Sequence, residues 1–265
     1  MTTEKPIADA GAYRPAQLIV RKIAMVDLRD AVANGVADFN AMPTHLAFLC
    51  LIYPIVILIA ARTAAGHDVL PLVFPLLAGY TLIGPLVAVG MYELSRRREK
   101  GLDISRRHAF DVLRFPSLRS IAALGVVTMA IYAAWLAAAR AIYEQIFGGA
   151  VPASIAEFVR QVFTTPSGLT LIIVGCSVGL LFAVVVFTLS VVSFPLLLDR
   201  DPGVMTAVAT SMRAVLANPM TMAMWGLIVA GALLIGSLPF FVGLAVVLPV
   251  LGHSTWHLYR KLVQS

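Results

Sequence analysis

Charged residues are scarce in this chain, and its longest stretches have none. Only 13% of the 265 residues are Asp, Glu, Lys or Arg, and none occurs between Pro166 and Leu198 or between Ala214 and Tyr259. Soluble domains carry about 25% charged residues. Because a helix needs about 20 apolar residues to cross a hydrocarbon core of about 30 Å, the scarcity excludes an ordinary soluble domain. It predicts a polytopic helical membrane protein.

Cysteine is also rare, since Cys50 and Cys176 are the only two and each lies inside an apolar stretch. Two isolated cysteines make neither a disulfide framework nor a paired metal motif. The sequence also lacks a Walker loop, a dinucleotide fingerprint, a nucleophile elbow and a zinc motif. The apolar stretches hold no charge at mid-depth, which argues against a proton- or ion-coupled pump. We therefore expect no enzyme and no cofactor.

The apolar stretches predict one all-α transmembrane domain over residues 27–265, preceded by a cytoplasmic tail over residues 1–26. Six spans are expected, at about 44–61, 69–94, 120–139, 168–197, 220–236 and 239–258. The last apolar block is too long for one helix, and the turn signal Gly236–Pro239 divides it. Each half is near the lower limit for crossing, so five spans is the alternative.

Two short helices are expected at the membrane surface. The first carries apolar residues at helical spacing, with Asp38 away from them and Asp27 as a candidate N-cap; its apolar residues are Leu28, Val32, Gly35, Val36 and Phe39. The second follows a capping box formed by Ser154 and Glu157. Both patterns indicate interfacial helices.

An internal repeat is also indicated. The triplet at 31–33 precedes Pro43 by ten residues, and the matching triplet at 207–209 precedes Pro219 in the same way, with a weaker copy around Pro116. This predicts three parallel hairpin repeats, each made of a surface helix, a proline bend and a hairpin. The alternative is that hairpins in one membrane share proline bends and aromatic belts by necessity.

The distribution of basic residues predicts the orientation. All but three of the 20 lysines and arginines fall on one side of the expected spans, the exceptions being Arg62, Arg140 and Arg160. Because cytoplasmic loops are enriched in Lys and Arg, both termini are expected in the cytoplasm. The loop after the second span is the most basic and is expected to face anionic lipid or a partner; its candidate contacts are Arg96, Arg97, Arg98, Lys100, Arg106 and Arg107. Basic residues placed beside spans do not indicate nucleic acid.

Two pairs of residues are candidates for special roles. His253 and His257 lie four residues apart on one helix face, a spacing that can hold a metal or haem iron. No Cys, Asp or Glu nearby in sequence completes a ligand shell, and aromatic and basic neighbours indicate an interfacial belt, so we expect no metal site. Gly175 and Gly179 form a small-xxx-small pair, compatible with internal packing or with a homo-oligomer face.

Several motifs in order resemble one family. They are Gly84-Pro85-Leu86 with Tyr92-Glu93 and Ser95-Arg96-Arg97, then Ser193-Phe194-Pro195 to Asp199-Arg200, Ala217-Asn218-Pro219, Met224-Trp225-Gly226 and the segment at 244–261. Together they resemble an uncharacterised family of bacterial integral-membrane proteins, classed as a domain of unknown function, from about Val20 to the C-terminus. Some members carry a cytochrome c oxidase label. The resemblance implies the bacterial inner membrane and no established activity.

Two function classes remain. The first is a non-catalytic accessory, assembly or stabilising subunit of a larger membrane complex, with a respiratory complex as one option, because apolar spans and surface helices suit lateral packing against lipid and other subunits. The second is a transporter or channel for a small or hydrophobic solute, because prolines in the second and sixth spans permit helix breaks. A polar cavity at mid-membrane would favour the second class.

Overall fold

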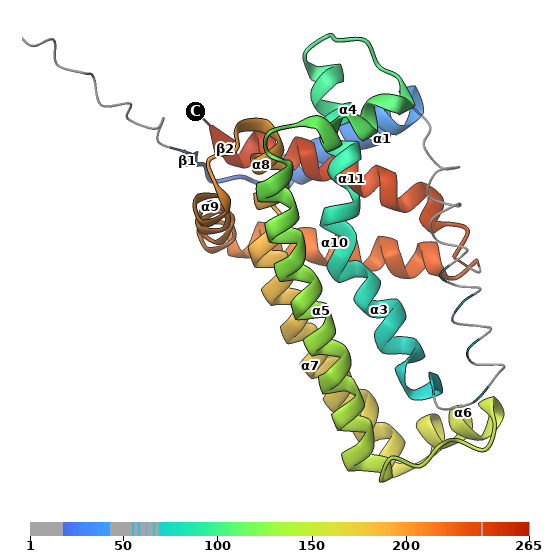
Figure 1. Cartoon of the computed structure of the whole chain (residues 1–265). Helices are drawn as coiled ribbons and strands as arrows, with labels where there is room; N and C mark the ends of the chain where they lie inside the picture. Colours follow the sequence, from blue (N-terminus) through green and yellow to red (C-terminus); the bar gives the residue numbers. More distant parts are fainter. Residues whose placement is uncertain are drawn as a thin grey trace, which may run out of the picture.

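Figure 1 shows the computed structural model, which describes residues 18–42, 69–239 and 241–264 and the isolated residues Ile55, Leu58, Arg62 and Gly66. Its strands β1 (Ile19–Val20) and β2 (Val263–Gln264) form one short antiparallel ladder. The other elements are α1 (Met25–Ala41), α3 (Leu70–Val87), α4 (Val89–Glu99), the 3₁₀ helix η2 (Arg106–Arg114), α5 (Leu118–Phe147), α6 (Ile155–Thr164), α7 (Pro166–Ser190), α8 (Ser193–Arg200), α9 (Val204–Ala217), α10 (Pro219–Ser237) and α11 (Leu244–Leu262). The expected all-α class is confirmed for the described residues.

Helices run in two directions in this fold. Helix α5 packs against both α3 and α7, and Figure 1 shows these three descending from the top of the view towards α6 at the bottom. Helices α10 and α11 pack against each other and run across them in the same view. We call the end where α1, α4, α8 and α11 meet the core end, and the end at α6 the distal end.

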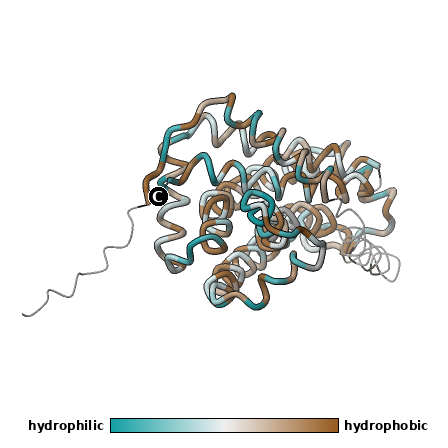
Figure 2. Tube along the Cα trace, turned by 90° about the horizontal axis from the view of Figure 1, so that it is seen from above, coloured by the Kyte–Doolittle hydropathy of each residue, from teal (hydrophilic) through white to brown (hydrophobic). Residues whose placement is uncertain are grey.

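Three helical segments of the described residues are long and apolar enough to cross a membrane: Leu118–Phe147, Pro166–Arg200, which comprises α7 and α8, and Pro219–Ser237. Figure 2 shows hydrophobic residues along most of the trace. At 1.5 Å per residue, the 30 residues of α5 extend about 45 Å, more than the hydrocarbon core requires. The arrangement of six spans in three repeats is not confirmed, because all of residues 44–61 except Ile55 and Leu58 lie outside the described part and α10 and α11 run across the α5–α7 pair.

Two of the expected spans are each divided into two helices. The span expected at 69–94 consists of α3 and α4, and the one expected at 168–197 consists of α7 and α8. The second break has a clear cause. Pro195 has no N–H to donate to the carbonyl four residues earlier, at Val191, and its ring would clash with that group. The α7 helix ends beside Val191, and the chain turns before α8 begins.

The main hydrophobic core lies at the core end around the short helix α8. All of Ser193 to Leu198 is buried, and Phe194, Leu196 and Leu197 have no exposed surface. The aromatic side chains of Trp225, Trp256 and Tyr259 belong to the same cluster. This packing fixes the positions of α4 and α11, which carry the polar groups described below.

Helix α1 lies against α11, and its buried face differs from the expected one. The buried residues are Leu28, Ala31, Gly35 and Asp38, so the aspartate expected on the outer face points inward. Small side chains allow this close approach, since a Cβ at Gly35 would lie 2.0 Å from the Oγ of Ser254. The expected N-cap at Asp27 is also wrong: the helix begins at Met25 with Ala24 as N-cap. Asp27 instead accepts the Ala24 N–H from inside the first turn.

Helix α6 begins as its capping signal predicts. Ser154 is the N-cap, and its Oγ accepts the backbone N–H of Glu157 at 3.1 Å. At 10 residues, or about 15 Å, the helix is too short to cross a bilayer. It lies at the distal end of the α5–α7 pair (Figure 1).

Candidate functional site: a buried polar cluster

A buried carboxylate joins three helices at the core end. Asp38 of α1 is only 3% exposed. Its Oδ2 accepts the hydroxyl of Ser95 from α4 at 2.5 Å and lies 2.8 Å from the Nε2 of His257 on α11. Its Oδ1 accepts a hydrogen bond from Nη1 of Arg98, also on α4, at 2.5 Å. Every polar atom of this carboxylate is therefore engaged, which offsets the cost of burying its charge.

His253 extends this cluster by one further hydrogen bond. Its Nδ1 lies 2.8 Å from the Oγ of Ser95. An ionised Asp38 can only accept hydrogen bonds, so the Ser95 hydroxyl donates its single hydrogen towards the carboxylate. The imidazole of His253 must then donate from Nδ1 to the Ser95 oxygen. The Nε2 of His253 makes no hydrogen bond that is resolved among the residues that the structure describes. The result is a donor chain from His253 through Ser95 to Asp38.

The pKa of Asp38 reflects two opposing effects. Burial would raise it, because low polarity disfavours the charged form. This effect is outweighed by hydrogen bonds that the carboxylate accepts from His257, Ser95 and Arg98, and by the positive charge of a protonated His257. Together they hold the pKa of Asp38 below its ordinary value of 3.8. The carboxylate is therefore ionised at neutral pH. It pairs with the guanidinium of Arg98, whose side chain is 39% exposed and reaches the surface.

The C-terminal turn of α11 adds an outer set of ion pairs. Arg260 donates from Nε to Oε1 of Glu99 at 2.9 Å, and the indole N–H of Trp256 reaches the other oxygen of that carboxylate at 3.0 Å. Lys261 Nζ lies 2.9 Å from Asp27 Oδ1 and 3.1 Å from Asp30 Oδ2. Helix α11 is thus tied to α4 on one side and to α1 on the other.

The segment before α1 is held by an amide side chain. Asn218, between α9 and α10, accepts the backbone N–H of Ile23 at 2.8 Å and donates to the carbonyl of Arg21 at 3.0 Å. Thr221 donates to the carbonyl of Ile23 at 3.2 Å. These bonds act with the β1–β2 ladder, so both ends of the described chain are joined at the core end.

The basic residues expected to face lipid are partly engaged inside the protein. Arg96 donates from Nε to the fully buried carboxylate of Glu93 at 2.7 Å, and its guanidinium lies 5.2 Å from the Phe115 ring centroid. Arg97 pairs with Asp111 at 3.4 Å. Glu93 and Arg96, three residues apart on α4, thus form an ion pair within the protein. Lys100 is exposed, while Arg106 and Arg107 begin η2. Contact of this loop with anionic lipid stays a prediction.

The two glycines of the small-xxx-small pair have different surroundings. A Cβ at Gly179 would lie 3.0 Å from Cη2 of Trp135, so this glycine allows α7 to approach α5 closely. A Cβ at Gly175 would meet no atom within 4 Å. The pair therefore serves internal packing at one residue and leaves the other facing open space.

The two histidines expected to bind no metal both lie in the polar cluster. Among the residues described, no three or more His, Cys, Asp and Glu side chains are grouped as a metal ion would require. His253 contacts Ser95 and His257 contacts Asp38, so each ring has a partner from another helix. A hydroxyl, a carboxylate and two imidazoles can pass protons along hydrogen bonds. The full burial of Ser95 and His253 keeps a substrate away from them.

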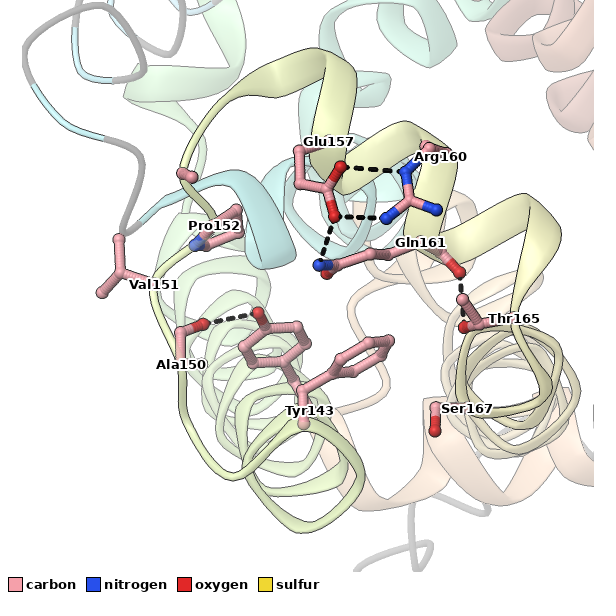
Figure 3. Close-up of a pocket in the computed structure, with 11 residues that line it drawn as sticks. Tyr143, Ala150, Val151, Pro152, Glu157, Arg160, Gln161, Thr165 and Ser167 are labelled. Atoms are coloured by element: carbon pink, nitrogen blue, oxygen red, sulfur yellow. Dashed lines mark hydrogen bonds and ion pairs between the residues drawn. The ribbon is translucent and has the colours of Figure 1, made fainter.

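A second polar site lies at the distal end, in a hollow of about 730 Å³ (Figure 3). Tyr143 of α5 donates its hydroxyl to the carbonyl of Ala150 at 2.7 Å. On α6, Glu157 accepts hydrogen bonds from Arg160 and Gln161 at 2.7 and 2.8 Å. The polar groups thus bond to one another around the rim, and the hollow is open to the surroundings.

Sequence reasoning missed the polar cluster, although one signal was present. Asp38 follows Leu28, Ala31 and Gly35 at spacings of three and four residues, which is the spacing of one helix face. A carboxylate on such a face requires partners from elsewhere in the chain. The expected apolar face included Leu28 and Gly35, which are buried, but its other residues Val32, Val36 and Phe39 centred it away from Asp38.

The three long apolar helices define the class of molecule: a helical integral membrane protein. Residues 73–199 match the model of a family described as "Predicted integral membrane protein (DUF2189)". The expected resemblance to an uncharacterised integral-membrane family is confirmed over this segment, which contains α4, η2 and α5 to α7, and nearly all of α3 and α8. No curated protein and no solved structure matches the chain.

Proposed function

We propose that the protein is a non-catalytic membrane protein that acts by contact, as an accessory, assembly or stabilising subunit of a larger membrane complex. The observation that carries this proposal is the outward surface of α7. Only 6% of the most apolar stretch of residues 166–200 is buried within the chain. Large side chains such as Leu180 and Leu181 are 63% and 66% exposed there. Such a surface fits lipid or another transmembrane helix.

The same surface offers a place for close helix packing. Gly175 faces open space, and its neighbours Cys176 and Ser177 are small and exposed. Lipid chains are as apolar as leucine, so helices associate in membranes where small residues let backbones approach. A partner helix could therefore contact α7 around Gly175 more closely than lipid does.

The polar cluster supports a contact role rather than a chemical one. Asp38, Ser95 and His253 are buried and bonded to one another, so they hold α1, α4 and α11 together. Removing a member of such a network costs stability because it leaves buried polar groups unpaired. The cluster thus provides a rigid core end from which α5 and α7 project.

Site-specific photocrosslinking in the native membrane tests this proposal. A photoreactive residue at Leu181 should give a discrete crosslinked protein band, which mass spectrometry of the partner identifies. The same residue at Val186, which is 2% exposed on the same helix, is the matched control and should crosslink only within the chain. Lipid adducts alone at Leu181, and at Ser177 beside Gly175, would contradict the proposal.

A transporter or channel is the second candidate, and one observation favours it. The chain of hydrogen bonds from His253 through Ser95 to Asp38 brings ionisable groups together, as proton relays do. These groups lie at the core end rather than along α5 or α7, which favours the contact role. Proteoliposomes of the isolated protein decide between the two, since a saturable flux lost in Asp38→Asn would establish transport.

A further inference from the structure

Helix α9 has its large apolar side chains on the outside and small or polar ones on the inside. Its buried residues Ala207, Thr210, Ser211 and Ala214 have no exposed surface. On the opposite face Met205 is 81% exposed and Leu216 is 74% exposed. A helix on the surface of a soluble protein shows the reverse pattern. The outward face of α9 therefore fits an apolar environment rather than water.

Hydrogen bonds to neighbouring helices fix which way α9 faces. Ser211 donates its hydroxyl to the carbonyl of Thr188 at 2.7 Å and accepts the N–H of Val192 at 3.2 Å. It thus satisfies backbone groups freed where α7 gives way to α8. Asn218 holds the C-terminal end of α9 through its bonds to the segment before α1. Rotation that would bury the methionines would break these bonds.

Length and direction exclude α9 as a span. Its 14 residues extend about 21 Å, less than the hydrocarbon core of about 30 Å. Figure 1 views α9 along its axis, while α5 and α7 run along the page, so α9 lies across them. It packs against α7 and α8, beside the core end of the span.

The exposed row continues onto the next helix. Met212 is 41% exposed on the same face of α9 as Leu216, and Met220 at the start of α10 is 75% exposed. Arg213 is exposed next to the row, and its guanidinium turns away from the row and donates a hydrogen bond to the hydroxyl of Thr210 at 3.2 Å. Methionine side chains are flexible and suit an irregular, fluid surface.

We propose that α9 is an in-plane membrane helix, with Met205, Met212 and Leu216 inserted into the bilayer at the boundary between headgroups and acyl chains. The exposed row of α9 contacts lipid, because it joins the apolar outer surfaces of α7 and α10 and lies beside the end of a span. Interfacial helices are held in this way by their apolar face, with charged side chains pointing to water. The inference is independent of any partner subunit on α7.

Spin labels on the full chain in lipid nanodiscs test the proposal. Cysteines replace Met205 and Leu216 one at a time, in a background without the natural cysteines. The matched control is Asp201→Cys, in the exposed turn before α9. Collision with oxygen, which concentrates in lipid, should exceed collision with a water-soluble nickel chelate several-fold at both test positions, and the order should reverse at the control.

Two outcomes would overturn the proposal. Free collision with the nickel chelate at both positions would show that the row faces water. Protection from both reagents would show that a second copy or another protein covers it. Because both test positions are highly exposed, the labels should not disturb folding, and the fluorescence of buried Trp225 gives an independent check of the core end.

Discussion

Replacing Asp38 with asparagine is the sharpest test of the polar cluster, because it removes the charge and keeps the shape. Breaking a buried ion pair by removing one partner typically costs about 3–5 kcal/mol. Here Arg98 is 39% exposed and can turn to solvent, which lowers the cost. The bonds from Ser95 and His257 would weaken from charged to neutral, at about 1 kcal/mol each. We therefore expect a loss of about 2–3 kcal/mol.

The measurement is the Tm of the purified protein in detergent, followed by tryptophan fluorescence. Trp225 and Trp256 are both 1% exposed at the core end and report on its unfolding. For a chain of this size, each kcal/mol lowers Tm by about 2–4 °C, so a decrease of about 5–10 °C is expected. The control is Asp30→Asn on the same helix, whose carboxylate is 52% exposed and pairs with Lys261.

An exposed pair of this kind contributes about 0–1 kcal/mol, so the control should lower Tm by no more than about 4 °C. Equal decreases in Tm for Asp38→Asn and Asp30→Asn would refute the reasoning, because they would mean that the interactions of Asp38 stabilise the fold no more than those of a surface carboxylate. A larger loss for Ser95→Ala in the wild type than in the Asp38→Asn background would show that the two groups act together.

Three further outcomes are expected. The pKa of Asp38 is held below 3.8 in the folded protein despite burial. The ionised carboxylate therefore contributes its full stabilisation of the fold above about pH 4, and this stabilisation is lost as the pH falls through the lower folded pKa. Below about pH 4 the Tm of the wild type should therefore fall more steeply than the Tm of Asp38→Asn. Gly35→Ala places a methyl group against α11 and should lower the free energy of unfolding by about 1–3 kcal/mol through overpacking. The control Gly226→Ala meets open space and should leave Tm unchanged or raised. Similar Tm values for the two variants would contradict the close packing of α1 against α11. In a background without the natural cysteines, a membrane-impermeant thiol reagent added outside intact cells should label Ala150→Cys and not Lys100→Cys, and the reverse labelling would overturn the orientation.

The sequence predicts the helices well and their mutual arrangement poorly. Long apolar runs and the capping box at Ser154 locate α5, α6 and α7, because these signals are local. Asp38 and His257, in contrast, are 219 residues apart, and no local pattern predicts that they meet. The breaks within expected spans were hidden for another reason. Hydropathy does not distinguish a continuous helix from two helices joined by a turn that is itself apolar, as at Val191.

The docking of α1 on α11 has a consequence for the order of synthesis. The groups that hold α1 in place include Ser254, His257 and Lys261, all in the last helix of the described chain. At about 5–20 residues per second, the ribosome needs about 10–45 s to travel from Asp38 to His257. During that interval α1 has emerged without its main packing surface, while the apolar helices in between enter the membrane. Closure of the core end is therefore a late step in biogenesis, and a chain shortened before α11 leaves its N-terminal helix without a binding site.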